Sequence, residues 1–184
     1  MSFWSVFLIG IALSFDGAAV AAANGARHKN WNFLKVLKIG LFFGCFHFLM
    51  VVVGELIGSG FSAFINGVDH WVAFVLLVGL GLKMLWESFG TVKEKQVDIH
   101  DLKILLLLSV ATSIDALVIG ISFAFVKVNF VLAALEIGLI IFFITIFSVY
   151  IGKKFGEYWG KKAEIVGGFV LLAIGIKILV THLL

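Results

Sequence analysis

The chain has 184 residues, of which 62% are hydrophobic and 14% are charged, and its formal net charge is +3 at pH 7. Its mean hydropathy of +1.16 lies well above that of soluble globular domains, because there are too few polar side chains to cover a surface exposed to water. A single cysteine excludes an internal disulfide and a CxxC redox pair. The composition therefore predicts an integral membrane protein.

Apolar runs of about 20 residues, long enough for a helix to cross a hydrocarbon core of roughly 30 Å, recur along the chain. They predict an all-α membrane protein with six transmembrane helices, at 3–23, 36–61, 71–89, 102–126, 130–151 and 163–183. Strands of a membrane barrel would instead alternate apolar and polar residues, which none of these runs does. The first run is not expected to be a cleaved signal, because it lacks a basic n-region and carries Asp16 in its apolar part.

Basic residues are concentrated in alternate loops. Loops two and four hold only Lys127, whereas loops one, three and five are flanked by Arg27, Lys29, Lys35, Lys38, Lys93, Lys95, Lys103, Lys153, Lys154, Lys161 and Lys162. By the positive-inside rule these three loops are cytoplasmic and both termini lie outside. The positive charge is thus explained by topology, and no nucleic-acid partner is expected.

The two halves of the chain resemble each other. The segment LIGIALSFDGAAV, from Leu8, aligns with LLSVATSIDALVI, from Leu107, and pairs Asp16 with Asp115 at an offset of 99 residues. Later matches keep their order at offsets of 98 and then 94 residues, and they pair Gly40, Gly54, Gly58, Gly81 and Lys83 with Gly138, Gly152, Gly156, Gly175 and Lys177. We therefore expect one repeat at 1–90, a cytoplasmic linker at 91–101 and a second repeat at 102–184.

Three helices per repeat force the second copy to enter the membrane from the opposite side, so the repeats are expected to be inverted. Inverted repeats are typical of secondary transporters, whose substrate site lies near the midplane where the repeats meet. A charge at the bilayer centre costs about 2.5 to 3.5 kcal/mol on insertion scales, so an acid there indicates function. Asp16 and Asp115 are therefore expected to share one cation. The alternative is that each makes a structural hydrogen bond to a neighbouring helix.

The segments SFDGAAVAAANG and ATSIDALVIGISFAF are similar to the two aspartate motifs of the MntP-type manganese efflux pumps, which are six-helix proteins of about this length. The resemblance covers essentially the whole chain, including DHWVAFVLLVGLG and KKAEIVGGFVLLAIGIKIL. The chain departs from the family where Gly17 and Ala18 follow Asp16, and where His47 replaces the usual Glu or Gln. The resemblance implies a multi-pass exporter of the bacterial cytoplasmic membrane, with Mn²⁺ as substrate and no permanently bound cofactor.

Ligand chemistry gives a candidate site beside this resemblance. Two carboxylates balance a divalent cation, and an imidazole favours Mn²⁺ and other transition ions over Mg²⁺ and Ca²⁺. His47 aligns with Thr145 at the offset of 98, and Thr112 lies on the helical face of Asp115. The expected metal ligands are therefore Asp16, Asp115, His47, Thr112 and Thr145. The alternatives are that His47 only joins two helices, and that the hydroxyls bond carbonyls of their own helix.

Further residues are secondary candidates. Ser14 and Ser113 are repeat-equivalent hydroxyl donors, and Gly17 is expected to interrupt the first helix after Asp16. Asn24, with the glycine after it, is expected to close that helix as a C-cap. Lys83 and Lys177 are expected to snorkel toward the interface, or to act as a gate or counter-charge for the aspartates.

Export of a divalent cation from a cell that is negative inside costs about 2 × 2.3 kcal/mol per 100 mV, which a passive pore does not supply. The sequence has no nucleotide-binding motif, so protons are the expected coupling ion. It also has no GxSxG or HExxH motif, and no enzyme activity is expected. A passive cation channel, an importer, or an exporter of another cation or small solute remain alternatives.

The orientation is testable by cysteine labelling. A cysteine placed near Asn66 should react with a membrane-impermeant thiol reagent added from outside, and one near Gln96 should not, because the basic loops stay in the cytoplasm. The reverse labelling pattern would overturn the orientation.

Overall fold

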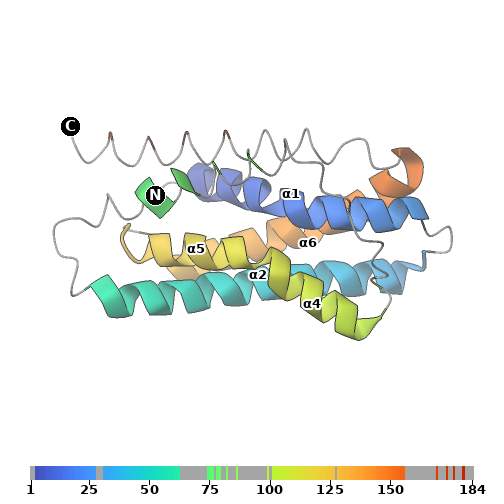
Figure 1. The fold of residues 1–184 in the computed structure, drawn as a ribbon, viewed down its shortest axis with the longest axis horizontal. Coiled ribbons are helices and arrows are strands. Elements are labelled where there is room, and N and C mark those ends of the chain that lie inside the picture. The colour runs from blue at the N-terminus through green and yellow to red at the C-terminus, as the bar shows by residue number, and fades with distance from the viewer. Residues whose placement is uncertain are drawn as a thin grey trace.

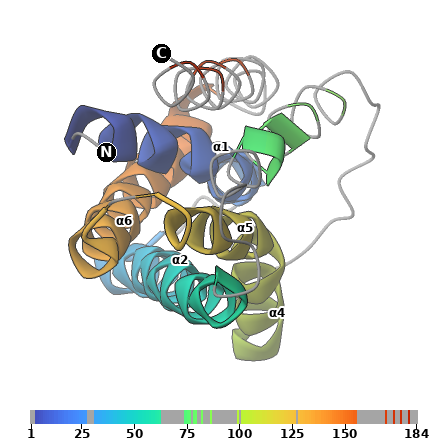
Figure 2. The same cartoon turned by 90° about the vertical axis from the view of Figure 1, so that its left-hand side faces the viewer.

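The structure is a computed structural model. It describes residues 3–27, 31–62, 101–126 and 128–155, and the positions 74–76, 78, 79, 82, 86, 99, 169, 173, 176 and 180. Its elements within these residues are all helices, namely α1 (Phe3–Arg27), α2 (Phe33–Ser62), α4 (Leu102–Thr112), α5 (Ile114–Phe123) and α6 (Phe130–Phe155) (Figure 1). Viewed from the end, these helices are grouped around one another in a bundle (Figure 2).

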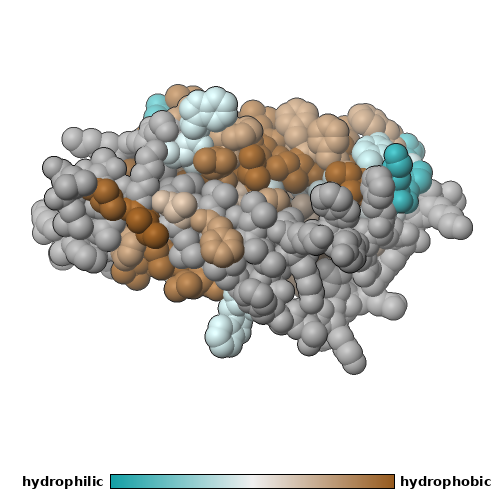
Figure 3. All heavy atoms as spheres, turned by 90° about the horizontal axis from the view of Figure 1, so that it is seen from above, coloured by the Kyte–Doolittle hydropathy of each residue, from teal (hydrophilic) through white to brown (hydrophobic). Residues whose placement is uncertain are grey.

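Four segments of the described chain are long and apolar enough to cross a membrane, at Phe3–Gly25, Phe33–Gly60, Leu102–Phe123 and Phe130–Lys154. They confirm four of the expected spans, while most of the spans expected at 71–89 and 163–183 lies outside the described residues. Large apolar side chains such as Leu107, Leu132 and Phe147 are 63% to 70% exposed. In Figure 3, hydrophobic residues cover much of the described surface that is in view. Hydrocarbon solvates such a surface, whereas water does not.

The segment 102–126 was expected to be one helix, and it is two. The main chain turns at Ser113, where φ is −85° and ψ is −1°, so that α4 ends at Thr112 and α5 begins at Ile114. The cause is local: the hydroxyls of Ser109, Thr112 and Ser113 donate to the carbonyls of Leu105, Leu108 and Val110 at 2.8, 3.0 and 3.0 Å. Hydroxyls that bond back to their own helix bend it. Asp115 therefore lies in the first turn of a new helix.

The break expected at Gly17 is wrong, because α1 continues through this residue. Gly17 lies against the ring of Phe43 instead, since a Cβ there would be 2.8 Å from Phe43 Cδ1. The C-cap expected at Asn24 is also wrong, because α1 runs on to Arg27. The Asn24 amide donates to the Val20 carbonyl at 3.0 Å from within the helix.

Glycines bring α2 and α5 into main-chain contact. A Cβ on Gly54 would overlap the Leu117 carbonyl oxygen, and a Cβ on Gly120 would overlap the Val51 carbonyl oxygen. Small residues allow this approach in membrane bundles, where packing and not a hydrophobic force holds helices together.

The α1–α6 contact is built in the same way, with Gly25 against the main chain of Val149 and Gly152 against that of Ala22. Between these two pairs, α2 crosses α6 where Gly44 and Gly138 approach each other's carbonyl oxygen. Three close crossings thus position the interior of the bundle.

Two glycines of α2 provide a test of this packing. Gly54→Ala should lower the melting temperature of the detergent-purified protein by the equivalent of about 1 to 3 kcal/mol, because the new methyl group overlaps a carbonyl oxygen. Gly60→Ala is the control, since Gly60 has no atom within 4 Å of its would-be Cβ in the described structure. Equal melting temperatures for the two variants would contradict the close contact.

Candidate metal centre

His47 is completely buried in the middle of α2. Its Nδ1 lies 2.8 Å from the carbonyl oxygen of Phe43, one turn earlier in the same helix. Because a carbonyl only accepts, Nδ1 of the neutral ring carries the hydrogen and Nε2 carries the lone pair. Nε2 is buried and has no hydrogen-bond partner in the described part of the chain. This is the state in which an imidazole binds a metal ion, with its second nitrogen oriented by a carbonyl.

Asp115 and the main chain of Thr112 both interact with the His47 ring. The contact between α2 and α5 explains this arrangement. The main chain of Val51 meets Gly120, and about one helical turn earlier in the two helices lie His47 and Asp115. An imidazole from one helix and a carboxylate from another are thereby brought to the same place.

Thr145 on α6, which the sequence alignment pairs with His47, has the same unusual property as His47. It is 0% exposed, and its hydroxyl oxygen has no hydrogen-bond partner among the residues described. The Glu136 Oε1 atom is also buried and unpartnered, but it belongs to a partly exposed side chain nearer the start of α6. Since nearly all buried polar atoms in proteins are satisfied, these exceptions require an explanation.

Asp16 lies partly buried in the middle of α1, where its Oδ1 accepts the N–H of Gly17 at 2.6 Å. The α1–α6 contact extends from Gly10, against Ile140, to Gly25, against Val149. Asp16 and Thr145 both lie within this contact. Asp16 and the unpartnered Thr145 Oγ1 therefore belong to α1 and α6, two helices that pack against each other.

Three expected hydroxyl donors are turned toward their own helices. Thr112 and Ser113 bond the carbonyls described above, and Ser14 donates to Ile11 at 2.6 Å. The back-bonding alternative therefore describes all three hydroxyls in this structure. Lys83 and Lys177 lie outside the described residues.

Asn24 is buried near the C-terminal end of α1, about two helical turns beyond Asp16. Besides its bond to Val20, its side-chain oxygen accepts the main-chain N–H of Ile99 at 3.5 Å. Ile99 is itself 1% exposed and belongs to the main apolar core. Asn24 thus joins the main chain at Ile99 to α1.

Within the described ranges, no three His, Cys, Asp or Glu side chains are gathered closely enough to hold a metal ion. The Asp115 and His47 pair is the nearest approach to a centre that the geometry provides. The sequence signal for the interruption is the group of three hydroxyl residues within 109–113, whereas the break was expected at Gly17.

A helical bundle with an apolar exterior and with carboxylate and imidazole groups in its membrane-length helices is a multi-pass membrane protein with an intramembrane polar site. A family model described as "Putative manganese efflux pump" matches residues 30–179, and the chain belongs to this family. The resemblance noted in the sequence is therefore confirmed, and the family is one of transporters and not of enzymes.

Similar proteins named "Putative manganese efflux pump MntP" span nearly the whole chain. That of Methanobrevibacter smithii is 44% identical over 178 residues, which are 97% of this chain and 97% of the relative. Those of Desulfitobacterium hafniense and Campylobacter fetus are 43% and 40% identical, over 97% of this chain in each case and 94% and 98% of the relative. No solved structure gives a significant match to the chain.

Thr145 and Ser122 are both buried hydroxyl residues, but only the Ser122 hydroxyl is bonded to its own helix. If Thr145 binds the ion, Thr145→Val should raise thermal stability in the absence of metal, by removing an unsatisfied atom worth about 1 to 3 kcal/mol, and should weaken Mn²⁺ binding. Ser122→Ala is the control and should leave Mn²⁺ affinity within about twofold, because the Ser122 hydroxyl is already bonded to the Val118 carbonyl at 3.0 Å. Unchanged affinity in Thr145→Val would remove Thr145 from the site.

Proposed function

We propose that the protein is a secondary active transporter that exports divalent metal, with Mn²⁺ as its main substrate. The family and the names of the relatives support the substrate. The observation that carries the proposal is the pair of buried acceptors without partners, His47 Nε2 and Thr145 Oγ1. They occupy repeat-equivalent positions on helices that pack against the two aspartate-bearing segments, and a cation bound by the aspartates would satisfy both.

The packing supports an inverted repeat. Under the offsets of 98 and 99 residues, the contact between Gly54 and Ile121 becomes that between Gly152 and Ala22, and both contacts are present. A two-fold axis in the membrane plane exchanges contacts in this way. Such an axis would place the cation site where the halves meet, as in other inverted-repeat transporters.

The central crossing follows the same rule. The contact between Gly44 and Gly138 becomes, by exchange, the contact between Phe142 and Gly40, which is also present. In this proposal α2 and α6 are therefore equivalent helices that cross near the axis, and the repeats are interlocked and not merely adjacent.

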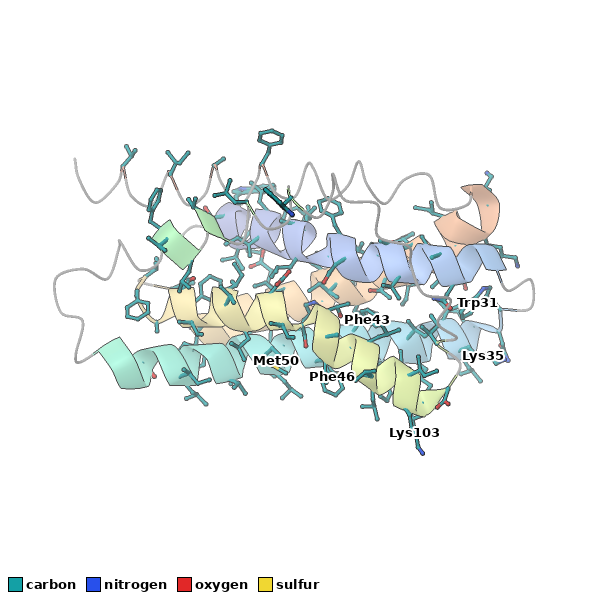
Figure 4. The ribbon with its side chains drawn as sticks, in the orientation of Figure 1. Trp31, Lys35, Phe43, Phe46, Met50 and Lys103 are labelled. Carbon is teal, nitrogen blue, oxygen red and sulfur yellow. The ribbon has the colours of Figure 1, made fainter. Side chains whose placement is uncertain are left out.

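The distribution of charge supports the proposed orientation. Lys35, Lys103 and the basic end of α6 lie at the same end of the bundle (Figures 1 and 4). This end would face the cytoplasm by the positive-inside rule, which leaves the chain termini outside. Metal would enter the site from this end and leave toward the end at which α1 begins.

Proton antiport follows from the ligand chemistry. Carboxylates and imidazole bind a metal only when deprotonated, so metal binding releases protons and metal release takes protons up. A site of two aspartates and one histidine then moves metal outward and protons inward in alternation. A passive cation channel is the alternative, and flux of Mn²⁺ against its own gradient in vesicles with an imposed pH gradient distinguishes the two.

The aspartates carry the first test of this function. Asp16→Asn and Asp115→Asn should each abolish manganese tolerance in a sensitive bacterial host at normal protein abundance, because the isosteric amide removes the charge that balances the ion. Asp101→Asn is the control, since Asp101 is exposed, caps α4 through the Lys103 N–H, and asparagine caps equally well. Full tolerance in either core variant would defeat the shared site.

His47 carries the test of ion selectivity. A nitrogen ligand favours Mn²⁺ over Mg²⁺, so His47→Gln should lower the ratio of Mn²⁺ to Mg²⁺ affinity while transport continues. Titrations of the purified protein with Mn²⁺, Mg²⁺ and Zn²⁺ measure the ratios. If stability falls and the ratios do not move, His47 is structural.

A further inference from the structure

The interruption at Ser113 exposes main-chain oxygens beside Asp115. In a continuous helix the Thr112 carbonyl would accept the N–H of Ala116. Here α4 ends at Thr112. The N–H of Leu117 donates to the Ser113 carbonyl at 3.2 Å, and this is the first hydrogen bond of α5. The last carbonyls of a helix need a partner from elsewhere.

The main chain of Thr112 interacts with the ring of His47, and the Asp115 carboxylate acts on the ring electrostatically. The lone pair of Nε2 and a carbonyl oxygen are both acceptors. In the described structure no hydrogen-bond donor satisfies Nε2. A buried imidazole lone pair beside a carbonyl oxygen is unfavourable unless a cation lies between the two atoms.

We propose that the main-chain carbonyl oxygen of Thr112 is a ligand of the transported divalent cation, together with His47 Nε2 and the Asp115 carboxylate. This inference rests on the proposed function and adds a ligand to its site. It also explains why side chains alone form no cluster of three metal-binding groups in the described residues.

The ends of the two half-helices suit this role. The C-terminal end of α4 carries the negative end of its helix dipole, which favours a cation, while the N-terminal end of α5, where Asp115 lies, favours an acidic side chain. A carbonyl and a carboxylate oxygen with one imidazole nitrogen form a mixed set that fits Mn²⁺ better than ions that prefer oxygen alone.

The other repeat does not provide the same ligand. Leu13 is the repeat equivalent of Thr112, and it lies inside the unbroken α1. Its carbonyl belongs to a continuous helix. The two aspartate segments therefore differ in their main chain, and the difference supplies a matched control.

The test replaces a single amide by an ester in the full-length protein. Incorporation of the α-hydroxy acid analogue of serine at position 113 makes the Thr112 carbonyl an ester, which is a weaker donor to cations, and leaves every side chain in place. Mn²⁺ titrations of the protein in lipid nanodiscs, followed by electron paramagnetic resonance, should show affinity reduced about tenfold or more. The same replacement at Ser14 weakens the Leu13 carbonyl and should leave the affinity unchanged.

The outcomes separate this inference from the function on which it rests. If Asp115→Asn abolishes Mn²⁺ binding while the ester at 113 binds like the ester at 14, the metal site stands and the Thr112 carbonyl is not a ligand. If the unaltered protein binds no Mn²⁺, the proposed function itself fails.

A second measurement covers the case in which the ester at 113 does not fold. Protein labelled with carbonyl-¹³C threonine should show a ¹³C coupling to bound Mn²⁺ by electron–nuclear double resonance. Thr112→Ser, with unlabelled serine, should remove the coupling, whereas Thr145→Ser should keep it. A coupling that is absent in the labelled unaltered protein, or that persists in Thr112→Ser, overturns the assignment.

Discussion

The approach of α2 to α5, main chain against main chain at Gly54 and Gly120, is the constraint on which the rest of the interior depends. Any side chain at either position would push the helices apart, and the His47 ring would then move away from Asp115. The contacts of Gly25 and Gly152 hold α1 to α6 in the same manner. In a bilayer these contacts replace the hydrophobic force that would gather helices in water.

The polar interior is stable only because few groups remain unsatisfied. An unpaired buried acceptor costs about 1 to 3 kcal/mol, which is a large part of the stability of a small protein. Most hydroxyls of the bundle avoid this cost by bonding their own helix, as Ser14 and Ser113 do. His47 Nε2 and Thr145 Oγ1 stand out against that background. One is a nitrogen of α2 and the other an oxygen of α6, so the two helices offer different ligand chemistry.

The sequence predicted the parts of the fold that depend on length, polarity and repetition. Apolar runs located the four described spans, and the repeat matched Gly54 with Gly152, both of which lie at helix contacts. It did not predict the interruption at Ser113, because a serine in an apolar run can leave a helix intact, as Ser14 does. Nor could the spacing of Thr112 and Asp115 show whether the side chain or the main chain faces His47.

Glycine was the residue most easily misread from sequence. Gly17 beside an aspartate suggested a break, yet the missing side chain makes room for the Phe43 ring in an unbroken helix. Gly25 suggested a helix end, yet it allows α1 to touch α6. A glycine is required both where the main chain turns and where another group comes close, and only the three-dimensional neighbours distinguish these two reasons.

The joint at Ser113 makes the two aspartate-bearing segments unequal in stiffness. To bend α1 near Asp16, main-chain hydrogen bonds of a continuous helix would have to be broken. At Ser113 the helix ladder is already interrupted, so a change in the angle between α4 and α5 breaks few further bonds. Because glycine contacts fasten α5 to α2, the compliant arm is α4, which begins at the basic end of the bundle. The bundle therefore carries Asp16 on a continuous helix and Asp115 beside an interruption between two helices. A bend of the main chain costs least where α4 joins α5.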